Sequence, residues 1–206
     1  MKKLNFLPIA LMFSGILTTA TLCAQPIANN TKTETKKNRT DESTGTPKKD
    51  SFISRYFDIK ETYPSMPNLY GYYAASSNTK VKFMERYNKI KAAYPALKEV
   101  YANFAGTECT LDEFTKKYFE IKDTYPDLTK YWGDYAACKH DLPEFIKRYN
   151  AIKASSPDLA DFYGEYAASA YSLSEFSARY YGIKASNTGT KNCYGEYAGS
   201  TKKLSE

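Results

Sequence analysis

The feature that most constrains this chain is a pattern that occurs five times with a fixed period of 31 residues. Each copy opens with a phenylalanine, and these are Phe52, Phe83, Phe114, Phe145 and Phe176. A fixed period of about 20 to 50 residues is typical of repeat proteins, in which each unit packs mainly against its neighbours. The sequence therefore predicts one repeat domain over residues 51–206, with repeats that start near 51, 80, 111, 142 and 173.

The first half of each repeat has the pattern of an amphipathic helix. If the leading Phe is position 0, every copy has Tyr at position 4 and Ile at position 7, so the three side chains share one helix face. Three copies also have the spacing of a capping box, which marks a helix start: Thr110 with Glu113, Asp141 with Glu144, and Ser172 with Glu175. Four copies have Pro at position 12, which disfavours helical backbone in the residue before it. We therefore expect the first helix to end near position 11.

The second half of each repeat predicts a second helix. Positions 18 to 22 read aromatic, small, any residue, aromatic, Ala, as in Trp132–Ala136, and positions 19 and 23 are small in every copy. Glycine inside a helix costs on the order of 1 kcal/mol relative to alanine. Its recurrence at position 19 indicates that another backbone approaches closely there. We expect the second helix to pack both on the first helix of its own repeat and on the next repeat.

Together the two halves predict an all-α fold, an α-solenoid of five 31-residue helix-turn-helix repeats with about ten helices. The fifth repeat differs, because residues 187–192 replace the Tyr-Pro corner of the others. Terminal repeats are expected to be atypical, since one side of them faces water. On this basis an alanine substitution at Ile183 in the last repeat should cost less than one at Ile121 in the middle.

The N-terminal residues have the pattern of an export signal. Residues 1–24 combine Lys2 and Lys3 with an apolar run and a small residue at Ala24, after which we expect cleavage. Lipidation of Cys23 is the less favoured alternative, because Leu22 stands where a small residue is required. Residues 25–50 are rich in Thr, Lys and Asn and predict a disordered linker. We expect a secreted or periplasmic protein, of bacterial type.

The balance of basic and acidic residues limits the classes of partner that the repeat domain is expected to bind. The formal net charge of the whole chain is +6, but residues 51–206 hold 21 basic and 19 acidic residues. This balance lacks the basic excess of a nucleic-acid binder. After the signal, no stretch is long enough to span a bilayer, so we expect no transmembrane segment in the mature chain.

Two basic rows flank the apolar face of the first helix. Position 8 is Lys in every copy, and the candidate binding strip is Lys60, Lys91, Lys122, Lys153 and Lys184. The alternatives are that each Lys stem covers the edge of the apolar face, or that the ammonium group meets Asp134, Glu165 or Glu196 of the second helix. Position 3 is also basic in every copy: Arg55, Arg86, Lys117, Arg148 and Arg179. In three copies a Glu stands four residues earlier, which predicts i to i+4 ion pairs.

The sequence holds little that indicates catalysis. His140 is the only histidine and lies between repeats 3 and 4, with no motif around it. There is no phosphate-binding loop, nucleophile elbow or His/Cys spacing for a metal, so we expect no enzyme, cofactor or metal. The repeated surface favours a non-enzymatic protein or peptide interaction module. The alternative is a cell-surface binder of glycans or polyanions that uses the Lys row and Tyr rows at positions 4, 18 and 21, although core packing is the default for those Tyr.

Cysteine positions predict one disulfide bond. Export would place the chain in a compartment where disulfides persist. Cys109 precedes the first helix of repeat 3 and Cys138 follows its second helix, and these two ends are neighbours in an antiparallel hairpin. We therefore expect a Cys109–Cys138 bond, with Cys193 free or paired between molecules.

Overall fold

The computed structural model describes residues 50–186, 188–190 and 193–205. The expected signal peptide, residues 1–24, and residues 25–49 of the expected linker lie outside these described residues. Within them the chain forms ten α-helices and no strand, and consecutive helices pair as hairpins. The predicted all-α architecture of stacked helix-turn-helix repeats is therefore confirmed. No helix of the described part is long and apolar enough to cross a membrane.

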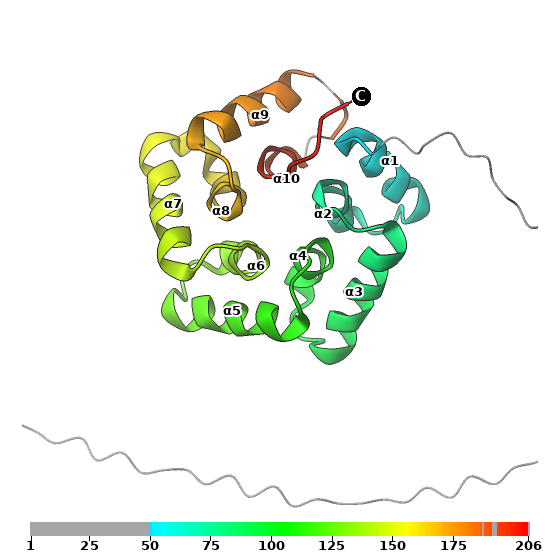
Figure 1. The fold of residues 1–206 in the computed structure, drawn as a ribbon, viewed down its shortest axis with the longest axis horizontal. Helices are drawn as coiled ribbons and strands as arrows, with labels where there is room; N and C mark the ends of the chain where they lie inside the picture. The colour runs from blue at the N-terminus through cyan, green and yellow to red at the C-terminus, as the bar shows by residue number, and fades with distance from the viewer. Residues whose placement is uncertain (1–49, 187, 191–192, 206) are drawn as a thin grey trace, which may run out of the picture. The chain divides into compact units, whose positions relative to one another are not determined.

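The first helix of each repeat lies on the outside of the domain (Figure 1). These outer helices are α1 (Phe52–Thr62), α3 (Lys80–Ala93), α5 (Leu111–Thr124), α7 (Leu142–Ser155) and α9 (Leu173–Ala185). Each begins at a Ser, Thr or Asp whose side chain accepts a hydrogen bond from a backbone amide of the first turn. Thr110 and Ser172 form the reciprocal capping boxes that their sequences predict. At Asp141 only one half of the box forms, because the Glu144 carboxylate pairs with Lys147.

The second helix of each repeat lies on the inside. The inner helices are α2 (Tyr70–Ala75), α4 (Tyr101–Gly106), α6 (Trp132–Ala137), α8 (Tyr163–Ala168) and α10 (Tyr194–Gly199). The first four follow short 3-10 helices, η1 (Pro67–Leu69), η2 (Lys98–Val100), η3 (Thr129–Tyr131) and η4 (Pro157–Phe162). The aromatic residue at position 18 stabilises the corner in several repeats. The Tyr101 hydroxyl donates to the Pro95 carbonyl at 2.8 Å, and Trp132 Nε1 donates to the Tyr125 carbonyl at 3.0 Å.

The core consists of the face that positions 0, 4 and 7 share. All five leading Phe and all five Ile are fully buried, and the five Tyr at position 4 are buried, as the helical spacing predicts. Aromatic pairs connect each repeat to the next. Tyr73 of repeat 1 meets Phe83 of repeat 2 edge to face, with ring centroids 5.4 Å apart, and Phe104 meets Phe114 in the same way at 5.3 Å.

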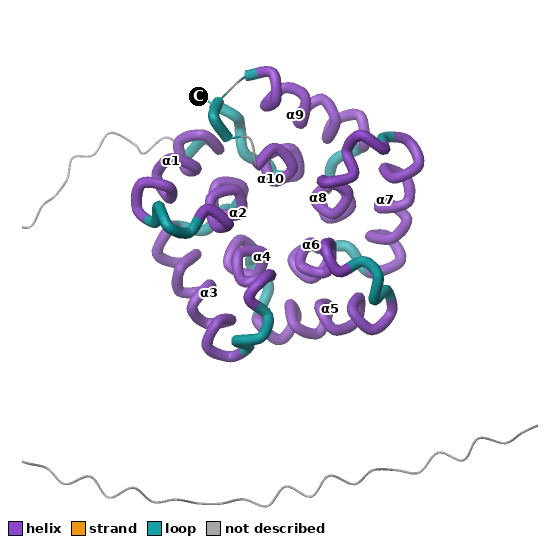
Figure 2. The backbone as a smooth tube through the Cα atoms, turned by 180° about the vertical axis from the view of Figure 1, so that it is seen from behind, coloured by secondary structure: helices purple, strands orange, loops and turns teal. Residues whose placement is uncertain are grey.

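The stack of repeats closes into a ring. The inner helices contact one another in the order α2, α4, α6, α8 and α10, and α10 also contacts α2 (Figures 1 and 2). The closing contact repeats the aromatic pair of the other interfaces, since Tyr197 of α10 meets Phe52 of α1 with ring centroids 5.2 Å apart. The expectation that one side of repeat 5 faces water is therefore wrong. Both sides of α10 are covered, because α8 contacts one side and α2 contacts the other.

Backbone bonds and one ion pair complete the closure. The amide of Phe52 donates to the Lys203 carbonyl at 2.9 Å, and that of Ile53 donates to the Leu204 carbonyl at 3.2 Å. These two amides belong to the first turn of α1, where no partner exists within the helix. Lys202 Nζ lies 2.5 Å from a carboxylate oxygen of Asp50, the first described residue. Residues 202–204, which follow α10, thus cap the start of α1.

The small residues of the inner helices explain how closely these helices pack. The close approach of another backbone was predicted at position 19, but it occurs at position 23, where a Cβ added to Gly106 would lie 3.2 Å from the backbone oxygen of Tyr72. At position 19 the neighbour is a side chain. A Cβ on Gly71 would lie 2.6 Å from Oε1 of Glu196, which belongs to the last repeat. The glycine of repeat 1 therefore leaves room for a residue that only ring closure brings to it.

Candidate functional site

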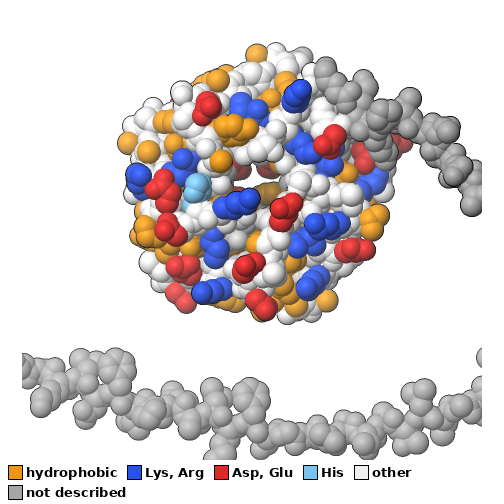
Figure 3. Space-filling model, in the orientation of Figure 1, with side chains coloured by type: hydrophobic (Ala, Val, Ile, Leu, Met, Phe, Trp, Pro, Cys, Tyr) orange, Lys and Arg blue, Asp and Glu red, His pale blue; other side chains and the backbone are white. Residues whose placement is uncertain are grey.

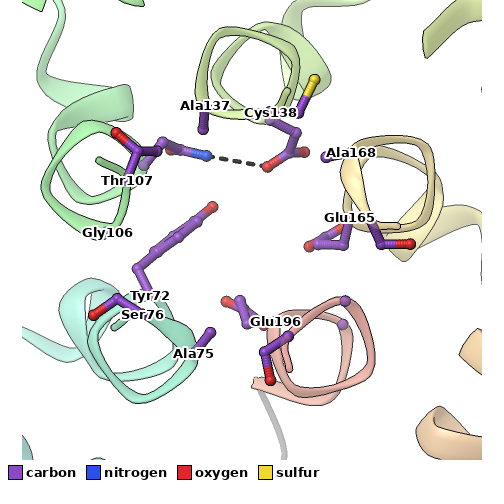
Figure 4. Close-up of a pocket in the computed structure, with 16 residues that line it drawn as sticks. Tyr72, Ala75, Ser76, Gly106, Thr107, Ala137, Cys138, Glu165, Ala168 and Glu196 are labelled. Carbon is purple, nitrogen blue, oxygen red and sulfur yellow. Dashed lines mark hydrogen bonds between the residues drawn. The ribbon is translucent and has the colours of Figure 1, made fainter. Parts of the chain in front are cut away.

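The inner helices surround a lumen into which the same position of all five repeats projects. Position 20 supplies Tyr72, Asn103, Asp134, Glu165 and Glu196. These residues line a cavity of about 220 Å³, together with the small side chains of position 23 and the Ser, Thr or Cys of position 24. Figure 4 shows Tyr72, Glu165 and Glu196 directed into this cavity from three different helices. Figure 3 shows that the face of the domain is hollowed at its centre.

Three of the five position-20 residues are carboxylic acids on consecutive inner helices. Asp134 is 9 % exposed, and its Oδ1 accepts a hydrogen bond of 3.0 Å from the Asn103 side-chain amide. Glu165 and Glu196 are partly exposed, through the lumen that they line. The carboxyl carbon of Glu165 would lie 3.1 Å from a Cβ on Gly195, so each acid packs against the next inner helix. This packing removes water from the carboxyl groups.

Burial raises the pKa of all three acids, and the charge of another of these acids raises it further for Asp134 and Glu196. Burial raises the pKa of Glu165 to about 7, and burial together with the charge of Glu165 raises the pKa of Glu196 to about 8. Burial, followed by the charges of Glu165 and Glu196, holds the pKa of Asp134 well above its usual range. Glu165 and Glu196 therefore titrate near neutral pH, and each acid can accept or donate a hydrogen bond depending on its protonation state.

The remaining charges near the lumen are few. Burial raises the pKa of the Tyr72 hydroxyl well above its usual range, and the charges of the three acids raise it further. Lys130 lowers the pKa of Asp134 and of Glu165, but its ammonium group pairs with Asp161 at 2.7 Å. No lysine or arginine stands among the residues that line the cavity. The lumen is thus an acidic cavity whose negative charge grows as the pH rises through the pKa values of Glu165 and Glu196, and a cation from outside can balance that charge.

The acids are not arranged as a metal site. Within the described part of the chain, no group of three His, Cys, Asp or Glu side chains is placed to hold a metal ion. Carboxylates that are spread around a ring suit a larger cation with several donors, such as an alkylammonium or guanidinium group.

The predicted Lys strip lies on the outer helices, away from the lumen. Four of its five ammonium groups, all but that of Lys91, lie over aromatic rings, as in Lys60 over Phe57 at 5.7 Å and Lys153 over Tyr149 at 5.7 Å. This geometry matches the alternative in which the Lys stem covers the edge of the apolar face. The other alternative, ion pairs with Asp134, Glu165 or Glu196, does not form, because those acids face the lumen. Whether Lys60, Lys91, Lys122, Lys153 and Lys184 bind a ligand stays a prediction.

The basic residues of position 3 have a structural role that the sequence did not reveal. The Arg148 guanidinium donates to the carbonyls of Tyr166 and Tyr171, at 3.1 and 2.6 Å, and stacks over the Tyr166 ring at 4.5 Å. It thereby connects the end of α8, where the Ala167 carbonyl also accepts from Arg148 at 3.3 Å, to the loop that follows this helix. The predicted ion pairs with a Glu four residues earlier are wrong, because Glu113 and Glu175 accept hydrogen bonds at their own helix starts and Glu144 pairs with Lys147.

The cysteines are free thiols in the described chain, so the structure does not support the predicted Cys109–Cys138 disulfide. Cys109 Sγ lies 3.0 Å from the Thr107 hydroxyl, and Cys138 Sγ lies 3.7 Å from Lys117 Nζ. Each sulfur therefore has a polar partner of its own. Cys193 is free and buried, and it immediately precedes α10.

His140 connects two repeats. Its Nε2 lies 2.8 Å from the Ser169 carbonyl oxygen, with which it forms a hydrogen bond across the boundary between repeats 3 and 4. This contact gives the only histidine of the chain a structural partner in the next repeat.

Sequence reasoning did not identify the lumen. It treated Asp134, Glu165 and Glu196 as possible partners of the Lys row, because it assumed an open stack in which they face different directions. The signal that could have located them is a polar residue at position 20, between two small residues at 19 and 23, in a helix whose other faces are apolar. Only ring closure makes these side chains converge.

Comparisons with protein-family models, with curated protein sequences and with solved structures find no match for this chain.

Proposed function

We propose that the repeat domain is a non-enzymatic module for binding a protein or peptide, and that its lumen receives a basic side chain of that partner. The observation that supports this proposal is the convergence of Asp134, Glu165 and Glu196 on one cavity. Their pKa values are raised first by burial, and the charge of Glu165 also raises those of Asp134 and Glu196, so ionising the acids in the closed lumen is unfavourable. A lysine or arginine side chain relieves this repulsion and supplies several hydrogen-bond donors.

The chemistry of the side chains around the lumen suits binding better than catalysis. Cys138 lines the cavity, but burial raises the pKa of its thiol, which lowers the fraction of reactive thiolate. His140 is occupied by the Ser169 carbonyl. The export pattern of residues 1–24 leads us to propose that the module works outside the cytosol.

A second candidate function uses the outer surface. Phe57, Phe119 and Tyr181 are between 40 % and 45 % exposed, and each has a lysine of the Lys strip beside its ring. Exposed aromatic rings next to ammonium groups suit a glycan or polyanion, because sugars stack on the rings and anionic groups pair with the lysines. This candidate retains the Lys strip as its site.

Calorimetric titration of the full chain with short peptides tests both candidates. We expect peptides that carry one Lys or Arg to bind, and a Glu165→Gln/Glu196→Gln variant to lose at least about tenfold in affinity, the equivalent of about 1.4 kcal/mol. The matched control is Glu85→Gln/Asp123→Asn, which removes two exposed charges outside the lumen and should bind as the wild type does. Equal losses in the two variants would show that only the net charge matters.

A second titration separates the outer surface from the lumen. A Lys91→Gln/Lys122→Gln/Lys153→Gln variant should keep its affinity for basic peptides. If this variant instead loses binding of a sulfated polysaccharide that the wild type binds in a salt-dependent way, the polyanion candidate is correct. If neither basic peptides nor the polysaccharide bind the wild type, both candidates are wrong.

A further inference from the structure

The interface between α10 and α2 differs from every other interface of the ring. The other neighbouring inner helices are joined by the chain, whereas α10 and α2 come from opposite ends of it. We call this interface the seam. It is held by the Phe52–Tyr197 ring pair, by two backbone hydrogen bonds from the start of α1 and by the ion pair of Lys202 with Asp50. Since no covalent connection crosses it, it is the place where the ring can open without unfolding a repeat.

Glu196 of α10 lies on the seam. Its carboxyl group packs against Gly71 of α2, where an added Cβ would lie 2.6 Å from Oε1 and 2.8 Å from the carboxyl carbon. The opposite side of the seam therefore removes water from this carboxyl group. Opening the seam returns the group to water, which favours its ionised form.

The side chains around Glu196 do not compensate its charge, although its own backbone amide lowers its pKa. Arg179 of α9, the nearest outer helix, directs its guanidinium to the carbonyls of Tyr197, Ala198, Ser200 and Lys202. Neighbouring groups that can only be neutral or negative include Glu165 of α8, Asp134 of α6, Tyr72 of α2, Tyr56 of α1 and Cys193 before α10. Ionised Glu196 is thus a desolvated charge among like charges.

We infer that protons control closure of the ring, which is closed while Glu196 is protonated and opens at the seam when Glu196 ionises. The pKa of Glu196, about 8 in the closed ring, supports this assignment. An exposed Glu has a pKa of about 4.3, so opening releases a proton. Between these values, the ratio of open to closed molecules rises by up to about tenfold for each pH unit. This inference does not depend on what the lumen binds.

Spin-label distances test the inference. Labels on Lys60→Cys of α1 and Lys184→Cys of α9 report the seam, in a background of Cys109→Ser, Cys138→Ser and Cys193→Ala. Labels on Lys122→Cys of α5 and Lys153→Cys of α7 occupy the same repeat positions across an interface that the chain connects. Because all four sites are exposed and equivalent, the second pair is a matched control.

We expect both pairs to give one similar distance at pH 5.5. At pH 9 the seam pair should gain a second, longer distance, while the control pair stays unchanged. Glu196→Gln, which stays neutral, should abolish the longer distance. Unchanged distances for both pairs at pH 9 would overturn the inference. Equal broadening of both distance distributions would also overturn it, because it indicates that the whole domain loosens and not the seam alone.

A measurement on the unmodified chain covers the case in which the cysteine background does not fold. The Ile53 amide bonds to the Leu204 carbonyl across the seam, whereas the Phe114 amide bonds to Thr110 within repeat 3. Hydrogen-exchange protection factors, corrected for the intrinsic effect of pH, should fall for Ile53 between pH 6 and 8.5 and hold for Phe114. Parallel behaviour of the two amides contradicts seam opening.

Discussion

Phe52 and Tyr197 form an edge-to-face ring pair with centroids 5.2 Å apart, although they belong to the first and the last repeat. Their interplanar angle of 66° is close to the 65° of Phe104 and Phe114, which belong to consecutive repeats. The seam therefore reproduces the packing of an internal interface. In the closed ring the first and last repeats each have two neighbours. Packing should therefore stabilise them as much as it stabilises a middle repeat.

The first prediction follows from this equivalence. Phe52→Ala and Phe114→Ala should each lower the free energy of unfolding by about 3–5 kcal/mol, because both rings are fully buried. The same equality should hold between Ile183→Ala and Ile121→Ala, in contrast to the smaller effect that an open solenoid predicts for Ile183. Urea unfolding followed by circular dichroism measures these values. A loss at Phe52 of less than half that at Phe114 would mean that the ring is open in solution.

The second prediction uses two helical glycines with opposite surroundings. Gly182→Ala in α9 should stabilise the protein by about 0.5–1 kcal/mol, because no atom lies within 4 Å of the added Cβ and alanine has the higher helix propensity. Gly71→Ala should destabilise it, since the Cβ would displace the Glu196 side chain and approach Cys193 Sγ at 3.0 Å. Thermal unfolding of both variants provides the comparison. Stabilisation by both substitutions is incompatible with a closed seam.

The third prediction concerns pH. The folded pKa values of Glu165 and Glu196, about 7 and 8, lie above the unfolded value of about 4.3, so the folded state binds more protons between these limits. The contribution of these two groups to the free energy of unfolding should therefore be largest below about pH 4.5. It should fall as the pH rises through 7 and 8. Each kcal/mol lost should lower the Tm by about 2–4 °C. Calorimetric scans between pH 5 and 8.5 measure this slope.

Two variants test whether the acids of the lumen cause this dependence of the free energy of unfolding on pH. Glu165→Gln/Glu196→Gln should flatten it, because the groups that titrate are removed. Glu113→Gln should leave it unchanged, since hydrogen bonds from Thr110 lower the pKa of Glu113 and move its effect below pH 5. A slope that survives in the double variant would show that other groups cause it.

The fourth prediction compares the two basic rows. Arg148→Gln should lower the free energy of unfolding by about 1.5–3 kcal/mol, because it leaves the carbonyls of Tyr166 and Tyr171 without their charged donor. Lys153→Gln in the same helix should change it by less than about 0.5 kcal/mol, since that side chain is exposed. Denaturant titration of the pair tests this difference. Equal effects would show that the Arg148 contacts add nothing beyond a surface charge.

The sequence by itself determined the local structure of the repeats. The spacing of Phe114, Tyr118 and Ile121 predicts a helix and its buried face, and Thr110 with Glu113 predicts its start, because both patterns depend only on the geometry of a single helix. The same is true of the small residues at positions 19 and 23, which predict close packing. They do not say what packs there, since the partner comes from another repeat.

Only the tertiary structure decided that the five repeats close and that a lumen results. Closure depends on the rotation between successive repeats, which must average one fifth of a full turn, and this rotation is set by many side-chain contacts that a periodic pattern does not specify. Asp134, Glu165 and Glu196 read as ordinary surface acids along the chain, and the packing of α6, α8 and α10 around the lumen brings them together. The physical reason is that a helix pattern encodes directions relative to its own axis, whereas a site formed by several helices depends on how those axes are placed.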